Sequence, residues 1–189
     1  GIEKELSGFL EKYAPDGLFF YNYDFPESAT AFADYLSCGG GMDYSDYLDG
    51  ASRKIVESAS GLVRKKAPGV QVGLIAEPQW ATTKENEAGQ NTLDPYSMLT
   101  DGHCDVKAMI EDGLADMIAV KAFGSLTDSK IPFERIVKWW SELAAENEVR
   151  MYTIHAADRM ANSTYAGWGS SDQMTKQAIS LESYKGCNG

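Results

Sequence analysis

The sequence predicts an α/β fold in which parallel strands alternate with helices, as in about half of a (β/α)8 barrel of the TIM type. Short apolar runs alternate with longer segments in which apolar residues recur at helical spacing. Strands that alternate with helices in this way form a parallel sheet with right-handed crossovers. The chain holds four such strand–helix units, and a complete barrel holds eight. We therefore expect residues 1–189 to form a single, incomplete barrel-type domain.

The first half of the chain contributes two of the expected strands. Apolar residues at helical spacing predict an amphipathic helix at the start, before the turn at Pro15-Asp16-Gly17. A strand is expected over residues 17–23, and a long loop over 27–50 with one short helix near 29–36. A helix over 52–66 ends in a basic turn and Pro68-Gly69, which is a C-terminal signal. The next strand, 70–76, is almost continuously apolar, as is typical of a strand covered on both faces.

The second half repeats the pattern after a long polar loop over residues 81–102. A short helix is expected over 106–112 and a strand over 114–122. Pro132 marks the start of another helix, which leads to a strand over 149–154. Ser170-Ser171-Asp172 caps a last helix that reaches residue 184, and residues 185–189 stop where a further strand would begin.

Composition excludes several classes of function. The net charge is −11 and Lys and Arg form no cluster, so we expect no nucleic-acid partner. No apolar run is long enough to span a bilayer, and no leader precedes the first helix, so we expect no membrane span and a targeting segment, if any, already removed. Cys38, Cys104 and Cys187 are widely spaced, which argues against a disulfide framework or a zinc site. We expect neither a metal nor a cofactor.

Polar and aromatic residues follow every expected strand, which makes the strand ends the candidate site. In parallel sheets, ligands bind at the carboxyl ends of the strands. Two carboxylates on adjacent strands suit glycoside hydrolysis, in which one acts as acid and the other as nucleophile or base. Asp24 and Glu77 are therefore the candidate catalytic residues. The candidate substrate-binding residues are Tyr21, Asn22, Tyr23, Trp80, Lys121, His155 and Trp168, of which Tyr23, Trp80 and Trp168 are expected to stack on sugar rings.

Several of these residues also have a structural explanation. Asp24 precedes Phe-Pro and could cap a turn. Lys121 could be a Schiff-base lysine, a substrate-binding cation or the ion-pair partner of Glu77, and the last two are favoured. His155 is either a site residue or a hydrogen-bonded loop anchor. Trp139 and Trp140 lie in a helix, where packing in the core is the better explanation.

Several motifs, in order along the chain, resemble one known family. They are Tyr13-Ala-Pro-Asp-Gly17 before the aromatic strand and Pro26, Ala67-Pro-Gly-Val-Gln-Val-Gly73 with Trp80, Gly113-Leu-Ala-Asp-Met-Ile-Ala119, Val137-Lys-Trp-Trp140, and Tyr152 to Ala157 followed by Gly167-Trp168. The chain resembles the glycosyl-hydrolase-like (β/α)8-barrel family of bacterial secreted, cell-surface and S-layer-associated proteins, over the C-terminal half of its barrel. The resemblance implies a carbohydrate substrate and a secreted or cell-surface location in bacteria.

The chain departs from this family at two strand ends. Where the family carries adjacent aspartates after the first of these strands, the chain has Tyr21-Asn22, and an amide cannot serve as nucleophile or general base. Where the family has a glutamine and an aromatic pair after the third strand, the chain has Lys121, Phe123 and Gly124, whereas His155 matches the family's histidine. Three hypotheses follow: a polysaccharide hydrolase with Asp24 and Glu77 as the carboxylate pair, a non-catalytic glycan-binding cell-surface module, and a lysine-dependent aldolase or lyase.

Half of a barrel leaves strand edges and its inner face uncovered. We therefore expect either that two copies associate to complete it or that the chain is part of a longer protein.

Overall fold

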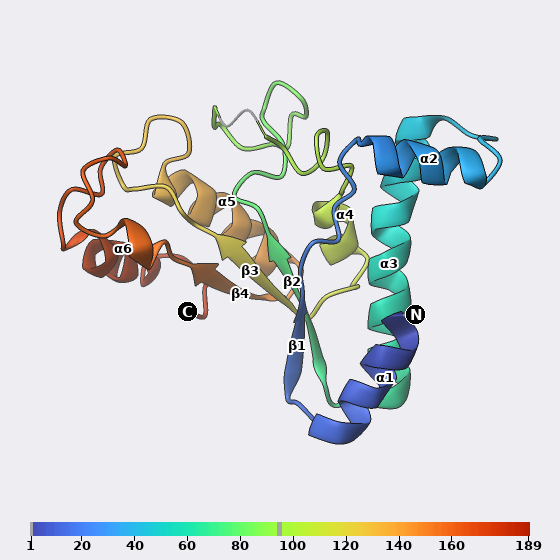
Figure 1. Cartoon of the computed structure of the whole chain (residues 1–189). Coiled ribbons are helices and arrows are strands. Elements are labelled where there is room, and N and C mark those ends of the chain that lie inside the picture. Colours follow the sequence, from blue (N-terminus) through green and yellow to red (C-terminus); the bar gives the residue numbers. More distant parts are fainter. Residues whose placement is uncertain (1, 94–95) are drawn as a thin grey trace.

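The computed structural model describes residues 2–93 and 96–189 and contains a single four-stranded parallel sheet (Figure 1). The strands lie in the order in which they occur in the chain. This architecture confirms the α/β prediction and the parallel sheet. The strands are β1 (Gly17–Phe20), β2 (Gln71–Ala76), β3 (Met117–Lys121) and β4 (Arg150–Ile154).

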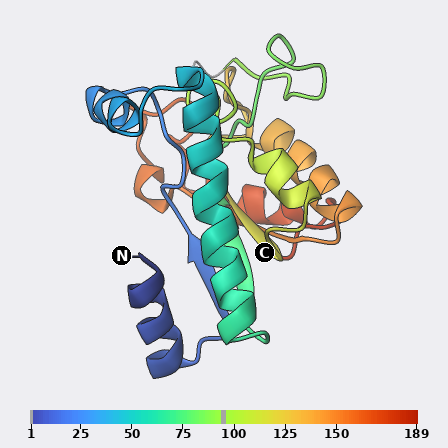
Figure 2. The same cartoon turned by 90° about the vertical axis from the view of Figure 1, so that its right-hand side faces the viewer.

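Helices connect the strands and pack beside the sheet. Figures 1 and 2 show α3 as a long rod, with α1 near its C-terminal end and α2 at its opposite end. Helix α5 packs on β3 and β4 and also contacts α6. None of the helices in the described ranges is long and apolar enough to cross a membrane. The helices are α1 (Ile2–Tyr13), α2 (Ala29–Ser37), α3 (Tyr44–Lys66), α4 (Val106–Glu111), α5 (Phe133–Glu146) and α6 (Gln173–Leu181), with a 3₁₀ turn η1 (Ala157–Arg159).

The main core lies between the sheet and the helices α4 and α5, with Val56 of α3 at its side. Alternate side chains of a strand point to opposite faces, so each strand gives one set of residues to this core. Its strand members are fully buried and pack around α5, on which Trp140 is fully buried and Trp139 is partly buried. Core packing is therefore confirmed as the role of this tryptophan pair. The strand members are Leu74, Ala76, Ile118, Val120 and Met151.

The opposite face of the sheet is less covered. Phe19 points to this face and remains 42% exposed, and its ring meets the ring of Tyr152 on β4 edge to face at 6.3 Å. The Phe19 ring lies directly over Gly73, where a Cβ atom would come within 2.4 Å of Phe19 Cδ1. A side chain on Gly73 would therefore displace Phe19, which explains the glycine in the middle of an otherwise apolar strand.

The last residues of the chain extend the sheet beyond β4. Met151 N donates to Gly186 O at 3.2 Å, Asn188 N donates to Met151 O at 2.7 Å, and Thr153 N donates to Gly189 O at 2.7 Å. Met151 and Cys187 form a parallel bridge. Residues 186–189 thus begin to pair as a further parallel strand, at the place where the sequence predicts one.

Four boundaries differ from the prediction by three residues or more. Strand β3 begins at Met117 rather than at residue 114, and helix α6 ends at Leu181 rather than at residue 184. The other two differences have a clear local cause. The first strand ends at Phe20 rather than at residue 23, because Asn22 has a φ of 56° and turns the chain out of the extended conformation. Helix α3 begins at Tyr44 rather than at residue 52. Asp43 caps its first turn by accepting a hydrogen bond from Ser45 N at 2.9 Å. This helix start is hidden in the sequence by a glycine- and aspartate-rich stretch that is typical of a loop.

Candidate functional site

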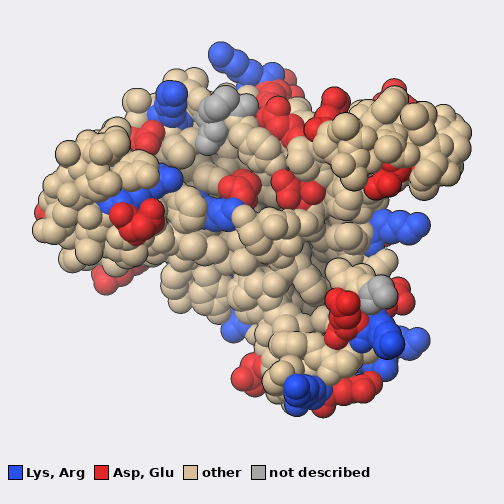
Figure 3. Space-filling model, viewed as in Figure 1, with Lys and Arg blue, Asp and Glu red and all other residues tan. Residues whose placement is uncertain are grey.

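A cavity of about 490 Å³ lies at the carboxyl ends of the strands. Four of the residues that the sequence singles out line it together, namely Tyr21, Asn22, Asp24 and Glu77. Figure 3 shows acidic and basic side chains next to one another near the middle of the side of the molecule that it presents. The cavity is also lined by Phe123, which follows the third strand, and by residues that sequence reasoning missed, among them Tyr96 and Arg159.

Glu77 and Lys121 form an ion pair across the ends of β2 and β3. They follow Ala76 and Val120, which are paired in the sheet, so the backbone register places their side chains side by side. Lys121 Nζ also donates to Tyr21 Oη at 2.7 Å and lies 4.3 Å from the centre of its ring. Of the alternatives for Lys121, the ion pair with Glu77 is present in the structure.

The surroundings of Lys121 keep its amine protonated. Burial lowers the pKa of Lys121, but the hydrogen bonds to Glu77 and Tyr21 outweigh it and raise the pKa above its ordinary value. A Schiff-base lysine needs a lowered pKa, because only the neutral amine attacks a carbonyl. The geometry therefore disfavours the lysine-dependent aldolase or lyase.

Asp24 is held by the long loop between β2 and α4. Tyr96 Oη donates to Asp24 Oδ2 at 2.8 Å. Burial and this hydrogen bond both raise the pKa of Tyr96 well above its ordinary value, so the phenol stays a donor to the carboxylate. The Asp24 side chain thus points toward residue 96 and the cavity rather than serving only its own turn. Tyr96 lies deep in a polar loop, and its spacing in the sequence does not connect it with Asp24.

Arg159 brings a cation to the cavity wall, whereas Lys121 is not among the lining residues. Its Nη1 donates to the backbone oxygen of Phe123 at 3.1 Å. Its guanidinium carbon lies 5.5 Å from the centre of the Phe123 ring and 4.8 Å from that of Tyr165. Arg159 follows β4 by five positions, in the turn η1, so a search of the strand ends that extends past His155 would include it.

The three aromatic residues expected to stack on sugars are placed elsewhere. Tyr23, Trp80 and Trp168 are 3%, 3% and 1% exposed, and none is among the residues that line the cavity. Trp80 stacks on Trp139 with ring centres 5.5 Å apart, and its indole N–H donates to Asp105 at 3.0 Å. Large apolar rings in polar loops have folded back into the core, because burial of their surface is favourable.

His155 also lies away from the cavity. Its Nε2 is 2.9 Å from Thr153 Oγ1 and its Nδ1 is 2.9 Å from Gln177 Oε1. Its ring packs on Phe133 at the start of α5. Since both ring nitrogens are engaged, the structure agrees with the interpretation of His155 as a hydrogen-bonded loop anchor between β4 and α6.

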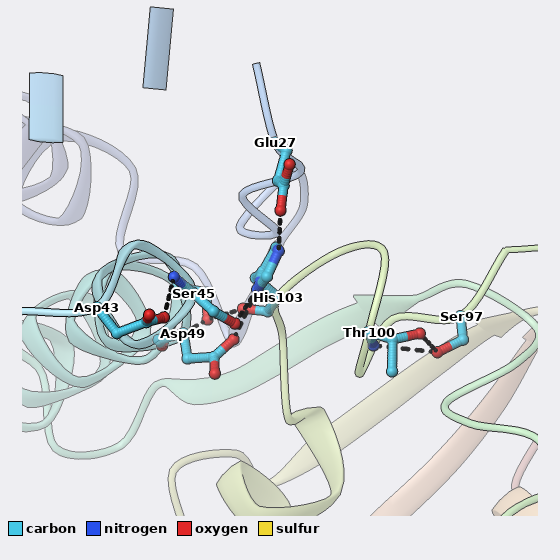
Figure 4. Close-up of polar contacts among 8 residues, drawn as sticks. Glu27, Asp43, Ser45, Asp49, Ser97, Thr100 and His103 are labelled. Carbon is cyan, nitrogen blue, oxygen red and sulfur yellow. Dashed lines mark hydrogen bonds and ion pairs between the residues drawn. The ribbon is translucent and has the colours of Figure 1, made fainter. Parts of the chain in front are cut away.

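A second polar cluster supports the loop that carries Asp24 (Figure 4). His103 is 7% exposed, and its Nδ1 lies 3.0 Å from Asp49 Oδ1 and 3.4 Å from Ser45 Oγ, whereas its Nε2 lies 3.9 Å from Glu27 Oε1. Ser45 and Asp49 both contact Nδ1 of His103. In a catalytic triad the serine and the aspartate contact different ring nitrogens of the histidine, so this arrangement is not a triad. His103 instead links α3 to residue 27, three positions after Asp24.

Buried thiol and phenol groups should make stability fall at alkaline pH. Burial raises the pKa of Cys104 to about 12, from an ordinary value of 9.0, and raises the pKa of Tyr23 and Tyr96 as well. The folded state then binds more protons than the unfolded state, so the free energy of unfolding decreases as the pH rises from about 9 to 12. Urea unfolding at several pH values measures this decrease. Cys104→Ala should make the decrease shallower, whereas Cys38→Ala, at an exposed thiol, should keep the wild-type slope; equal slopes in all three proteins would contradict the expectation.

Comparisons with known proteins agree with the resemblance seen in the sequence. No family model matches the chain. The protein named glycosyl hydrolase DigH from Escherichia coli (strain K12) is 22% identical over 156 residues, which cover 80% of this chain and 35% of that protein. The protein named glycosyl hydrolase YngK from Bacillus subtilis (strain 168) is 23% identical over 189 residues, which cover 93% of this chain and 36% of that protein. The chain thus spans about a third of the length of these relatives, and the comparisons support a relationship with glycosyl-hydrolase-like proteins.

Proposed function

We propose that this chain belongs to a glycoside hydrolase that acts on a polysaccharide, with Asp24 and Glu77 as the catalytic carboxylate pair. The observation that carries the proposal is that both carboxylates line one open cavity at neighbouring strand ends. One carboxylate would protonate the leaving oxygen, and the other would act as nucleophile or as the base for water. The glycosyl hydrolase names of the relatives support this reaction class.

The remaining cavity residues suit a sugar chain. Asn22 and the hydroxyl of Tyr21 can exchange hydrogen bonds with sugar hydroxyls, and Lys121 fixes both Glu77 and Tyr21. Tyr21 is 52% exposed and Phe123 is partly exposed, so these two rings take the stacking role first expected of the buried tryptophans. Phe123 lies beside Arg159, and Tyr21 beside Lys121, so each ring has a cation at its side.

The proposal includes a (β/α)8 barrel that further strands complete, and a location outside the bacterial cell or on its surface. The sequential order of the parallel strands and the exposed Phe19 face are what a partial (β/α)8 barrel would show, and residues 186–189 continue it. Further strands, from a second copy or from a longer chain, would cover that face. A carbohydrate polymer as substrate would place the protein outside the bacterial cell or on its surface. Light scattering that finds a compact, aggregation-resistant monomer of the chain alone would contradict the need for such strands.

The test of the proposed reaction is product release from plant and bacterial cell-wall polysaccharides, read by mass spectrometry. The proposal expects shortened oligosaccharides that increase with time and with protein concentration. Asp24→Asn, which retains the shape of the side chain, should stop their release while circular dichroism shows an intact fold. Equal release by the wild type and by Asp24→Asn would overturn the assignment of the carboxylate pair.

A non-catalytic glycan-binding module is the second candidate function. Two observations favour it. Asn22 is an amide at the strand end where the family that the sequence resembles carries a carboxylate, and Glu77 is already paired with Lys121. Saturable binding of a polysaccharide, with no product even at long incubation, would support this candidate over the hydrolase.

A further inference from the structure

Arg159 is a charged side chain of the cavity wall, and no carboxylate within residues 2–93 and 96–189 forms an ion pair with it. Among the described residues, the contacts of its guanidinium are the Phe123 backbone oxygen and the rings of Phe123 and Tyr165. Lys121, the other cation at this site, is paired with Glu77. In contrast, most Lys and Arg side chains with a described ion pair lie on the exposed outer surface, as Arg53 does with Glu57 and Asp112.

The position of Arg159 is fixed before any ligand arrives. Two aromatic rings contact the guanidinium, and one N–H is used by a backbone oxygen. A guanidinium has five N–H donors in a planar fork, so donors remain after this single hydrogen bond. Such a fork matches the two oxygens of a carboxylate, and its ordering in advance lowers the entropy lost on binding.

We propose that Arg159 binds a carboxylate on the sugar chain, so that the preferred substrate is a polysaccharide containing uronic acid units. This inference rests on the proposed function, because it names the substrate class of the same cavity. The carboxylate would occupy the Phe123 side of the cavity, away from the pair formed by Glu77 and Lys121.

Because the protein is strongly acidic overall, the position of Arg159 decides where an acidic sugar unit can bind. With a net charge of −11, the protein repels an anionic polymer except where a local cation compensates. Asp24 and Glu77 line the same cavity and would repel a carboxylate placed beside them. A cation on the wall of the cavity thus determines where along the sugar chain an acidic unit can lie.

The experiment compares the binding of matched oligosaccharides that differ at one group. Glucuronate- and galacturonate-containing oligosaccharides are tested beside their carboxyl-reduced counterparts by isothermal titration calorimetry, with ligand integrity checked by mass spectrometry. Wild-type protein should bind a carboxylated member about tenfold more tightly than its reduced counterpart, or better. The preference should disappear in Arg159→Gln and weaken in Arg159→Lys, which keeps the charge but loses the fork.

Arg135→Gln is the matched control, because Arg135 carries the same charge on α5 and its guanidinium donates to Asn91 O at 2.9 Å, outside the cavity lining. It should keep the wild-type preference. Equal binding of both members by the wild type, no binding of any carboxylated member, or an unchanged preference in Arg159→Gln would each overturn the inference. Because the readout is binding, it is independent of whether Asp24 and Glu77 cleave the chain, and product release tests that question separately.

Discussion

Replacing Glu77 by glutamine should lower kcat/KM on a cleaved polysaccharide by about a thousandfold or more. The amide has nearly the same shape as the carboxylate but can act neither as nucleophile nor as general base. Glu77 lies at the end of β2, lines the cavity and is paired with Lys121, so the substitution removes a charge from the centre of the site. Initial rates of reducing-end formation measure the effect.

Two further variants separate loss of chemistry from loss of structure. Asp24→Asn leaves the ion pair between Glu77 and Lys121 in place and should reduce the rate to a similar extent. Glu11→Gln removes an exposed carboxylate on α1, where it pairs with Lys66 at 3.3 Å, and should keep the wild-type rate. Wild-type rates in Glu77→Gln, with the fold intact, would exclude Glu77 from the reaction.

Replacing Trp140 by alanine should lower the free energy of unfolding by about 3–5 kcal/mol. Trp140 is fully buried at the centre of α5 and its indole N–H donates to Pro78 O at 2.8 Å, so the substitution opens a cavity and removes a hydrogen bond to the residue after Glu77. Urea denaturation followed by circular dichroism measures the loss.

The neighbouring tryptophan provides the control for this loss. Trp139 is only partly buried and donates to Ala88 O at 2.8 Å, so Trp139→Ala should cost less than Trp140→Ala. Trp140→Phe should fall between the wild type and Trp140→Ala, because it fills part of the cavity without the hydrogen bond. If Trp139→Ala were the more destabilising variant, the placement of the core between α5 and the sheet would be wrong.

The order of the elements could be predicted because hydrophobic period and helix-stop signals are local properties of the sequence. The parallel sheet follows from that order, and the strand ends then place Tyr21, Asn22, Asp24 and Glu77 at one edge. Even the ion pair between Glu77 and Lys121 is accessible from the sequence, since the two residues lie at the carboxyl ends of adjacent strands. Element boundaries near turns were harder to predict from the sequence. The end of β1 depends on the backbone conformation of Asn22, and the start of α3 depends on the cap formed by Asp43.

The roles of loop residues could not be predicted in the same way. Trp80 and Trp168 are preceded or followed by polar residues and glycines, yet both are buried, because the path of a loop depends on packing contacts distant in sequence. Tyr96 reaches the cavity for the same reason, from a position that no spacing rule connects with Asp24, whereas Arg159 lies five positions after β4. Both nitrogens of His155 are occupied by Thr153 and Gln177, and the partner on α6 lies far from it in the sequence.

The central claim, that this cavity hydrolyses a glycan, is tested most directly by running the reaction in water enriched in heavy oxygen. Hydrolysis adds one oxygen atom from water to each new reducing end, so wild-type products should carry one heavy oxygen, and Asp24→Asn and Glu77→Gln should release none of them. Products that carry an unsaturated sugar and no label would show an elimination in place of hydrolysis. Such products, or the absence of any product from polysaccharides that the protein binds, would contradict the account.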